Sequence, residues 1–283
     1  MTVLTTMYQL ANGVNIPKVA FGTWQIPGGE ATYQAVRAAL AAGYRHIDTA
    51  ALAYQNEASV GQAIRDSGIP REQIFVTTKL PAETKSYQGA LNDFDRSLKN
   101  LGLDYVDLYL VHAPWPWGQV GRVYDEANLD VWQAMEAIYQ SGRAKAIGVS
   151  NFAVRDLKNI LNQATIPPMV NQIQYYLGFT EPKITKFSEE HAMLVEAYSP
   201  LATGGVLDNP QVQAYADKYG VSVAQLALRF VLQNGVLPLP KAVNPAHIEA
   251  NTQLDFAISV ADMQALNDLP DAAGSYMHNP TQG

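Results

Sequence analysis

A regular alternation of short apolar runs with segments of helical period constrains this chain more than any other feature. The first pair is "KVAFGTW" followed by "ATYQAVRAALAAG", in which Val36, Ala39 and Leu40 fall on one helical face. Several strand cores, such as "IFV", "LYLV" and "AIGV", are apolar on successive residues, as expected for parallel strands covered on both faces. The chain contains eight such pairs. The simplest fold for eight such pairs is a closed barrel of parallel strands, so we predict one α/β domain over residues 1–283, a (β/α)8 TIM barrel.

The other seven pairs follow without a Pro-rich, Gly/Ser-rich or charged linker between them. Ahead of the first strand, "YQLANGVNIP" predicts a β-hairpin with Asn12-Gly13 as its turn. The pairs are "YRHIDTA" with "EASVGQAIRDSG", "IFVTTKL" with "YQGALNDFDRSLKNLG", "VDLYLVH" with "LDVWQAMEAIYQSG", "AKAIGVS" with "VRDLKNILNQA", "MVNQIQY" with "EPKITKFSEEH", "MLVEAYSP" with a helical stretch from about 209 to 233, and "GVLPLP" with "PAHIEANTQL".

The composition of the chain excludes several classes of protein. A chain of 283 residues with 48% hydrophobic and 16% charged residues can bury one sizeable core. The formal charge of −7 argues against general binding to nucleic acid or anionic membrane, because either would need a basic face. The sequence has no 18-residue apolar run and no signal peptide, so we expect a cytoplasmic protein. We also expect it to be a monomer. With no cysteine and five scattered histidines, neither a disulfide nor a metal site is expected.

Four polar residues converge on one end of the predicted barrel. Asp48 ends the second strand and Tyr54 follows it, while Lys79 and His112 end the third and fourth strands. Each alone has an ordinary structural explanation, such as a cap, a solvated strand end or a core histidine. Barrel enzymes place their chemistry at the carboxyl ends of the strands, so the four residues together indicate an acid/base site.

This set suits the addition of hydride to a carbonyl group, because negative charge develops on the oxygen and a proton must be supplied. We expect Lys79 to lower the pKa of the Tyr54 phenol from its ordinary value of about 10, and Asp48 to serve as counter-ion of the lysine. His112 would donate a hydrogen bond to the substrate oxygen.

A series of short segments runs along the chain in a characteristic order: "GTW", "GYRHIDTA", "NEASVG", "VTTKL", "DLYLVH", "AIGVSNF", "VNQIQY", "EAYSPL" and "LPKAV". By these segments the chain resembles the aldo-keto reductases over essentially its whole length. The family implies reversible reduction of aldehydes and ketones with NADPH, with possible use of NADH. It also implies Tyr54 as general acid, tuned by Lys79 and Asp48, with His112 positioning the substrate.

The resemblance also implies a set of cofactor-binding residues. Ser150, Asn151 and Gln172 would hold the carboxamide, and Tyr198 would stack on the nicotinamide, although "GVSN" alone also fits a helix cap. Residues of "SPLAT" would follow the pyrophosphate. The full expected set is Gly22, Thr23, Ser150, Asn151, Gln172, Tyr198, Ser199, Leu201, Thr203, Lys241, Ala242, Val243, Asn244, His247 and Asn251.

The chain departs from the family pattern between Asp48 and Tyr54. The tyrosine usually follows the aspartate by five positions, whereas here it follows by six, with Ala53 in the usual place. The spacing from Tyr54 to Lys79 stays typical, so the extra residue is confined to the loop, where an insertion costs little closure entropy. We expect Ala50 to Ala53 to bulge outward and Tyr54 to point into the pocket, with its hydroxyl within hydrogen-bond reach of Lys79 or His112.

A second departure lies in "KAVNPAHIEAN", the segment that resembles the adenosine-phosphate site. The family commonly has an arginine six positions after the lysine, where this chain has His247, and Ala242 replaces the usual Ser or Thr. A largely neutral imidazole binds phosphate less well than a guanidinium. We therefore expect NADPH to be preferred over NADH by a smaller margin than usual, with Asn244 adding a hydrogen bond near the 2′-phosphate.

The expected substrate is a small carbonyl compound held by aromatic walls from Trp24, Trp115 and Trp117, unless these tryptophans only seal the top of the barrel. Two other functions stay open. A non-catalytic nucleotide-binding relative with a protein partner would explain the extra residue before Tyr54. A cofactor-independent lyase or aldolase would use Lys79 as a Schiff-base nucleophile, although it would have no use for the nicotinamide segments.

Overall fold

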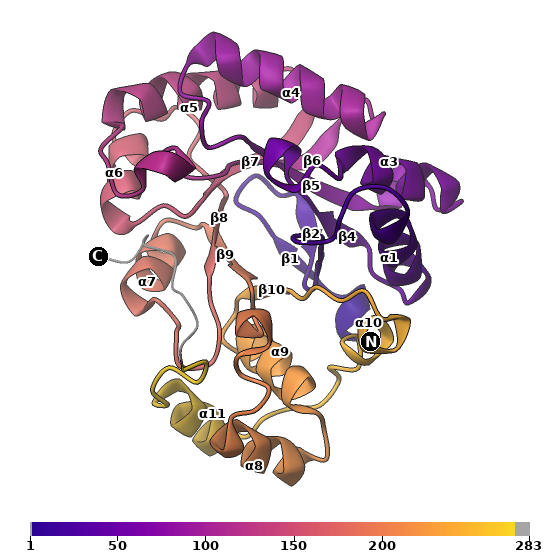
Figure 1. The fold of residues 1–283 in the computed structure, drawn as a ribbon. Helices are drawn as coiled ribbons and strands as arrows, with labels where there is room; N and C mark the ends of the chain where they lie inside the picture. The colour runs from indigo at the N-terminus through magenta and orange to yellow at the C-terminus, as the bar shows by residue number, and fades with distance from the viewer. Residues whose placement is uncertain (1, 275–283) are drawn as a thin grey trace.

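The computed structural model describes residues 2–274, except for the side chains of Leu52 and Ala53. Eight parallel strands lie in the order β10-β9-β8-β7-β6-β5-β4-β3, with helices arranged around them (Figure 1). The sheet closes where Ala20 N donates to Pro238 O at 3.1 Å and Gly22 N donates to Pro240 O at 3.0 Å. The predicted α/β barrel is therefore confirmed. Its strands are β3 (Phe21–Gly22), β4 (His46–Asp48), β5 (Phe75–Leu80), β6 (Val106–Val111), β7 (Ala144–Ser150), β8 (Val170–Gln174), β9 (Leu194–Tyr198) and β10 (Leu237–Leu239).

The helices lie on the outside of the barrel, in the connections that the helical periods predicted. All six residues of β5 and of β6 are buried, because side chains fill the barrel interior and the helices cover its outer face. The α-helices are α1 (Glu30–Ala41), α2 (Ala51–Tyr54), α3 (Glu57–Asp66), α4 (Tyr87–Leu101), α5 (Asp125–Gln140), α6 (Val154–Leu161), α7 (Pro182–Glu190), α8 (Pro210–Tyr219), α9 (Val223–Gln233), α10 (Pro245–Ala250) and α11 (Val260–Asn267), with 3-10 turns at Val3–Thr5, Arg71–Gln73, Trp117–Gln119 and Ala202–Gly204.

The stretch from about 209 to 233 forms two helices rather than one. Gly220 ends α8 in the left-handed region, with φ of 64°, where a residue with a side chain would be strained. Ser222 then begins α9 with a capping box, in which its side chain and that of Gln225 each accept from the other residue's backbone N–H. The break lets α8 and α9 pack against each other beside the barrel.

The N-terminal hairpin, β1 (Met7–Gln9) with β2 (Asn15–Pro17), is present as predicted, with Gly13 at φ of 85° in its turn. The Asn12 side-chain amide donates to Lys145 O at 2.9 Å, next to the start of β7. Ile16 of β2 is fully buried in the main core. The hairpin therefore covers the amino-terminal end of the barrel and leaves the carboxyl ends of the strands for the site.

None of the helices between residues 2 and 274 is long and apolar enough to cross a membrane.

Candidate active site

A buried ion pair lies at the centre of the site. Asp48 is the last residue of β4, and Lys79 is in the neighbouring strand β5 with none of its surface exposed. Lys79 Nζ lies 2.7 Å from Asp48 Oδ1, 2.8 Å from Asp48 Oδ2 and 2.9 Å from the backbone oxygen of Thr49. The three hydrogens of the ammonium therefore all have acceptors, as a buried charge requires. The predicted counter-ion relation between Asp48 and Lys79 is confirmed.

Tyr54 ends the short helix α2 and contributes its side chain to the wall of a cavity that Asp48 also lines. Lys79 Nζ lies 5.3 Å from the centroid of its ring, and the His112 ring packs edge-on against it at 6.0 Å between centroids. The phenol therefore faces the pocket, as expected. In the described part of the chain, however, neither Lys79 nor His112 hydrogen-bonds to the Tyr54 hydroxyl, which corrects that expectation.

The pKa of Tyr54 also differs from the expected direction. Burial raises the pKa of this phenol well above its ordinary value, and the Asp48 carboxylate and the Tyr198 phenol raise it further. These effects outweigh the stabilisation of the phenolate by Lys79, whose hydrogens are directed at Asp48 and Thr49. The expectation of an acidified phenol is wrong for this arrangement, so Tyr54 holds its proton firmly.

The extra residue before Tyr54 is absorbed by a turn of helix. Ala50 and Ala51 are buried, so the expectation that residues 50–53 bulge outward is wrong for these two. A helix advances about 1.5 Å per residue where a strand advances about 3.3 Å, so a helical turn accommodates one more residue over the same span. Asn56 fixes the far end of the loop, since it accepts from Thr49 Oγ1 at 2.7 Å and donates to the Thr23 carbonyl at 3.1 Å.

His112 follows β6 at the same end of the barrel and is buried. Burial lowers its pKa to about 3, and the positive charge of Lys79 acts in the same direction. Its ring lies edge-on to Tyr54 and to Trp117, at 6.0 and 5.2 Å between centroids. The imidazole is therefore neutral at physiological pH and placed beside the phenol.

Of the residues expected to hold a carboxamide, Ser150 ends β7, Asn151 follows it and Gln172 is the central residue of β8, and all three are buried. Ser150 Oγ donates to Gln172 O at 2.9 Å, and Asn151 Nδ2 donates to His112 O at 2.9 Å. Tyr198, at the end of β9, donates from its hydroxyl to Asn151 Oδ1 at 2.7 Å. Asn151 adopts a left-handed backbone with φ of 62°, a strained conformation that often marks a functional position.

A cavity of about 920 Å³ extends from this centre to α8, α9 and α10. Most of the expected cofactor-binding residues line it, whereas Thr23, Ser150, Asn151 and Gln172 are buried and are not among its lining residues. The expected residues in the wall are Gly22, Tyr198, Ser199, Leu201, Thr203, Lys241, Ala242, Val243, Asn244, His247 and Asn251, together with Asp48, Tyr54 and Trp24.

Other lining residues carry no motif that distinguished them in the sequence. Gln213 is on α8, and Ser222 caps α9. Only the fold brings these elements to the cavity, and the capping box at Ser222 indicates a helix start rather than a binding site, so neither residue stands out in the sequence.

The three tryptophans differ in their position. Trp24 is 41% exposed and lines the cavity, whereas Trp117 is 38% exposed and packs against His112. Trp115 is buried in a small cluster with Ala82 and Ala113, and supports Trp117 at 5.3 Å between ring centroids. Trp24 therefore supplies an aromatic wall to the cavity, Trp117 packs beside His112 outside the set of lining residues, and Trp115 is buried in the loop.

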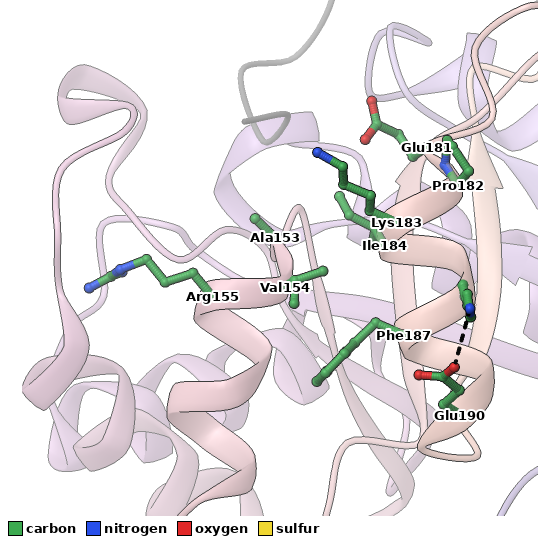
Figure 2. Close-up of a pocket in the computed structure, with 10 residues that line it drawn as sticks. Ala153, Val154, Arg155, Glu181, Pro182, Lys183, Ile184, Phe187 and Glu190 are labelled. Atoms are coloured by element: carbon green, nitrogen blue, oxygen red, sulfur yellow. Dashed lines mark ion pairs between the residues drawn. The ribbon is translucent and has the colours of Figure 1, made fainter.

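A second cavity, of about 650 Å³, lies between α6 and α7 outside the barrel (Figure 2). Its wall includes Arg155 from α6 and Phe187 from α7, beside an ion pair of 3.8 Å between Lys186 and Glu190. None of the residues predicted for the site lines it. The chemistry of the site therefore belongs to the cavity at the carboxyl ends of the strands.

Comparison with known proteins gives consistent matches. The sequence model of the Aldo/keto reductase family matches residues 18–270. Glyoxal reductase of Bacillus subtilis (strain 168) is 39% identical over 269 residues, which cover 95% of this chain and 94% of that protein. A crystal structure of an aldo/keto reductase from Brucella melitensis superposes with a TM-score of 0.86 at 40% identity, covering 93% of this chain and 98% of that one. The Bombyx mori aldo-keto reductase in complex with NADP gives a TM-score of 0.83 at 35% identity, covering 93% and 92%.

Proposed function

The chain belongs to the aldo/keto reductase family, and we propose that it reduces aldehydes and ketones to alcohols by hydride transfer from NADPH, with Tyr54 as the general acid. Membership in this family makes it an oxidoreductase that acts on carbonyl groups with a nicotinamide cofactor. The observation that carries the assignment of the acid is that Tyr54 shares one cavity wall with Asp48 and lies beside Lys79.

The cavity fits an extended dinucleotide in both shape and chemistry. Tyr198 lines it at the barrel end, and Lys241 and Asn244 stand at the other end, where an ammonium and an amide suit a phosphate. At the barrel end, none of the described residues donates a hydrogen bond to Gln172 Oε1. This oxygen is therefore available to accept a hydrogen bond from the amino group of a carboxamide. When bound, the reduced nicotinamide supplies the hydride.

Tyr54 carries the proton that the reduction requires. Its high pKa means that the phenol is protonated throughout the physiological range, so a donor is always present. The proton passes from Tyr54 to the carbonyl oxygen as that oxygen gains negative charge, and leaves a phenolate. The Lys79 ammonium, held near the ring by Asp48, stabilises the phenolate that forms.

His112 orients the carbonyl group. A neutral imidazole can donate one N–H to the substrate oxygen without adding a positive charge that would compete for the proton of Tyr54. Trp117 packs edge-on against this ring, with 5.2 Å between the ring centroids. Together with Trp24, which lines the cavity, these residues favour a substrate that carries an apolar or aromatic group beside the carbonyl.

Other features predicted from the sequence remain proposals. Because His247 rather than arginine lines the phosphate end, we propose a reduced preference for NADPH over NADH. One reductase domain over residues 1–283, a monomeric state and a cytoplasmic location likewise stay predictions. The lyase alternative is disfavoured because Lys79 is fully buried and paired with Asp48, whereas a Schiff-base lysine must be accessible and uncharged.

The test is to mix the protein with NADPH and an aromatic aldehyde and follow the absorbance of the reduced nicotinamide. Consumption of NADPH that depends on both protein and aldehyde is the expected result. Tight NADPH binding without turnover would favour a non-catalytic nucleotide-binding protein, and conversion of the substrate without cofactor would favour a lyase. Either outcome would contradict the proposed reductase.

A further inference from the structure

A second acidic residue is buried inside the barrel, beyond the four predicted catalytic residues. Glu196 is in β9, directly opposite Gln172 of β8 in the parallel register, and none of its surface is exposed. Its Oε2 accepts from Gln172 Nε2 at 2.8 Å. Its Oε1 has no hydrogen-bond partner within the described residues. A carboxyl group placed so deeply is costly, which requires a physical reason.

The Gln172 amide connects Glu196 to the catalytic centre. Its Nε2 donates to Glu196 Oε2 at 2.8 Å and to Asp48 Oδ2 at 2.9 Å, so both amide hydrogens are used. Because the Asp48 carboxylate can only accept, the amide must present its nitrogen on this side. The Oε1 atom of Gln172 is therefore the only part of the amide left for the cofactor.

We propose that Glu196 is a positioning residue, which locks the Gln172 amide so that Oε1 accepts a hydrogen bond from the amino group of the nicotinamide carboxamide. This inference rests on the proposed use of a nicotinamide cofactor. Asp48 alone would hold one hydrogen of the amide and leave the second free to turn toward the cofactor as a donor. Glu196 takes that second hydrogen, so the site accepts from the carboxamide and fixes the side on which its amino group lies.

The protonation of Glu196 agrees with this role. Burial raises the pKa of Glu196 to about 8, and the negative charge of Asp48 contributes to the rise. Lys79 and the Gln172 hydrogen bond act in the opposite direction. At neutral pH the group is thus mostly a neutral acid, which can accept from Gln172 without adding a second charge beside Asp48.

If Glu196 positions Gln172 in this way, the protein should bind a cofactor that has the carboxamide amino group more tightly than one that lacks it. The probes are NADP⁺, its 3-acetylpyridine analogue, in which a methyl group replaces that amino group, and adenosine 2′,5′-bisphosphate, which lacks the nicotinamide. Calorimetric titration should show the wild-type protein binding NADP⁺ roughly five- to tenfold more tightly than the analogue, the value of about one hydrogen bond. Adenosine 2′,5′-bisphosphate reports the far end of the cavity alone.

Glu196→Met removes the acceptor but keeps an unbranched side chain of similar length. We expect the preference for NADP⁺ over the analogue to fall to about twofold or less, with binding of adenosine 2′,5′-bisphosphate unchanged. Glu196→Gln keeps an oxygen acceptor and should keep the wild-type preference. In a Gln172→Leu background, Glu196→Met should cause no further loss of preference, because both changes act through one contact.

Controls separate positioning from a structural effect. Glu57→Met also removes a buried, hydrogen-bonded carboxyl, on α3, and should leave the preference unchanged. Glu196→Leu is a second apolar variant, so the test stands if Glu196→Met does not fold. The inference would be overturned if folded Glu196→Met or Glu196→Leu kept the wild-type preference for NADP⁺ over the analogue. It would also be overturned if Glu196→Gln lost this preference. If the wild-type protein bound none of the three probes, the proposed function would fail, and this result is distinct from a preference that Glu196 does not influence.

Discussion

Removing the Lys79 ammonium should destabilise the protein far more than a typical substitution. In Lys79→Met, the Asp48 carboxylate loses two hydrogen bonds of 2.7 and 2.8 Å and keeps only the one from Gln172. The buried Thr49 carbonyl loses its donor as well. Breaking one side of a buried ion pair costs about 3–5 kcal/mol, because an uncompensated charge is left in the interior. We expect the free energy of unfolding to fall by about 4 kcal/mol.

The assay is urea unfolding followed by circular dichroism, as a double-mutant cycle with Asp48→Asn. The double variant carries no buried charge at this position, so it should lose about 2 kcal/mol less than the sum of the single variants. Lys85→Met is a matched control, since Lys85 Nζ makes one hydrogen bond of 2.9 Å to Ala113 O, and it should cost about 1 kcal/mol. A loss below about 1 kcal/mol in Lys79→Met, or additive losses in the cycle, would refute this reasoning.

Three other changes test separate parts of the site. His247→Arg should raise NADPH affinity about tenfold with little change for NADH, measured by fluorescence titration, and equal gains would show that residue 247 does not face the 2′-phosphate. Deleting Ala51 should let the Tyr54 hydroxyl approach Lys79 and raise turnover at saturating NADPH roughly tenfold at an unchanged melting temperature, whereas lower turnover would mean that the pocket is matched to the longer loop. Burial raises the pKa of Glu196 from 4.5 to about 8, so the folded protein binds this proton more tightly than the unfolded chain does. The free energy of unfolding should therefore be highest below pH 4.5 and should fall as the pH rises from 4.5 to 8. Unfolding measured against pH should show wild type losing a few kcal/mol relative to Glu196→Gln across this window, and parallel curves would contradict the shift.

The fold could be predicted because its main determinants are local. Apolar runs such as "LYLV" have the length and composition of strands buried on both faces, and the helical faces between them leave little choice of architecture. The break in residues 209–233 was not predicted, although Gly220 followed by a capping serine is a common end and start of helices. The pairing of Lys79 with Asp48 followed from the cost of burying a lone ammonium.

What could not be predicted depends on contacts between distant parts of the chain. The burial of Ala50 and Ala51 depends on how the loop packs against its neighbours, which local preferences do not determine. The direction of the Tyr54 pKa depends on the burial of the phenol and on its approach to Asp48 and Tyr198, which only the folded chain determines. The contact of Gln172 with Asp48 spans the barrel from β8 to β4, across 124 positions of sequence. No spacing rule in one sequence reports such a contact.

The most direct test of the account compares Tyr54→Phe with the wild-type protein in two measurements. Stopped-flow mixing of the NADPH complex with an aromatic aldehyde gives the rate of hydride transfer, and fluorescence titration gives the dissociation constant for NADPH. The variant should transfer hydride at least about a hundredfold more slowly, because the proton donor is lost, while its NADPH affinity stays within about twofold. A rate near that of the wild-type protein would contradict the assignment of Tyr54 as the general acid.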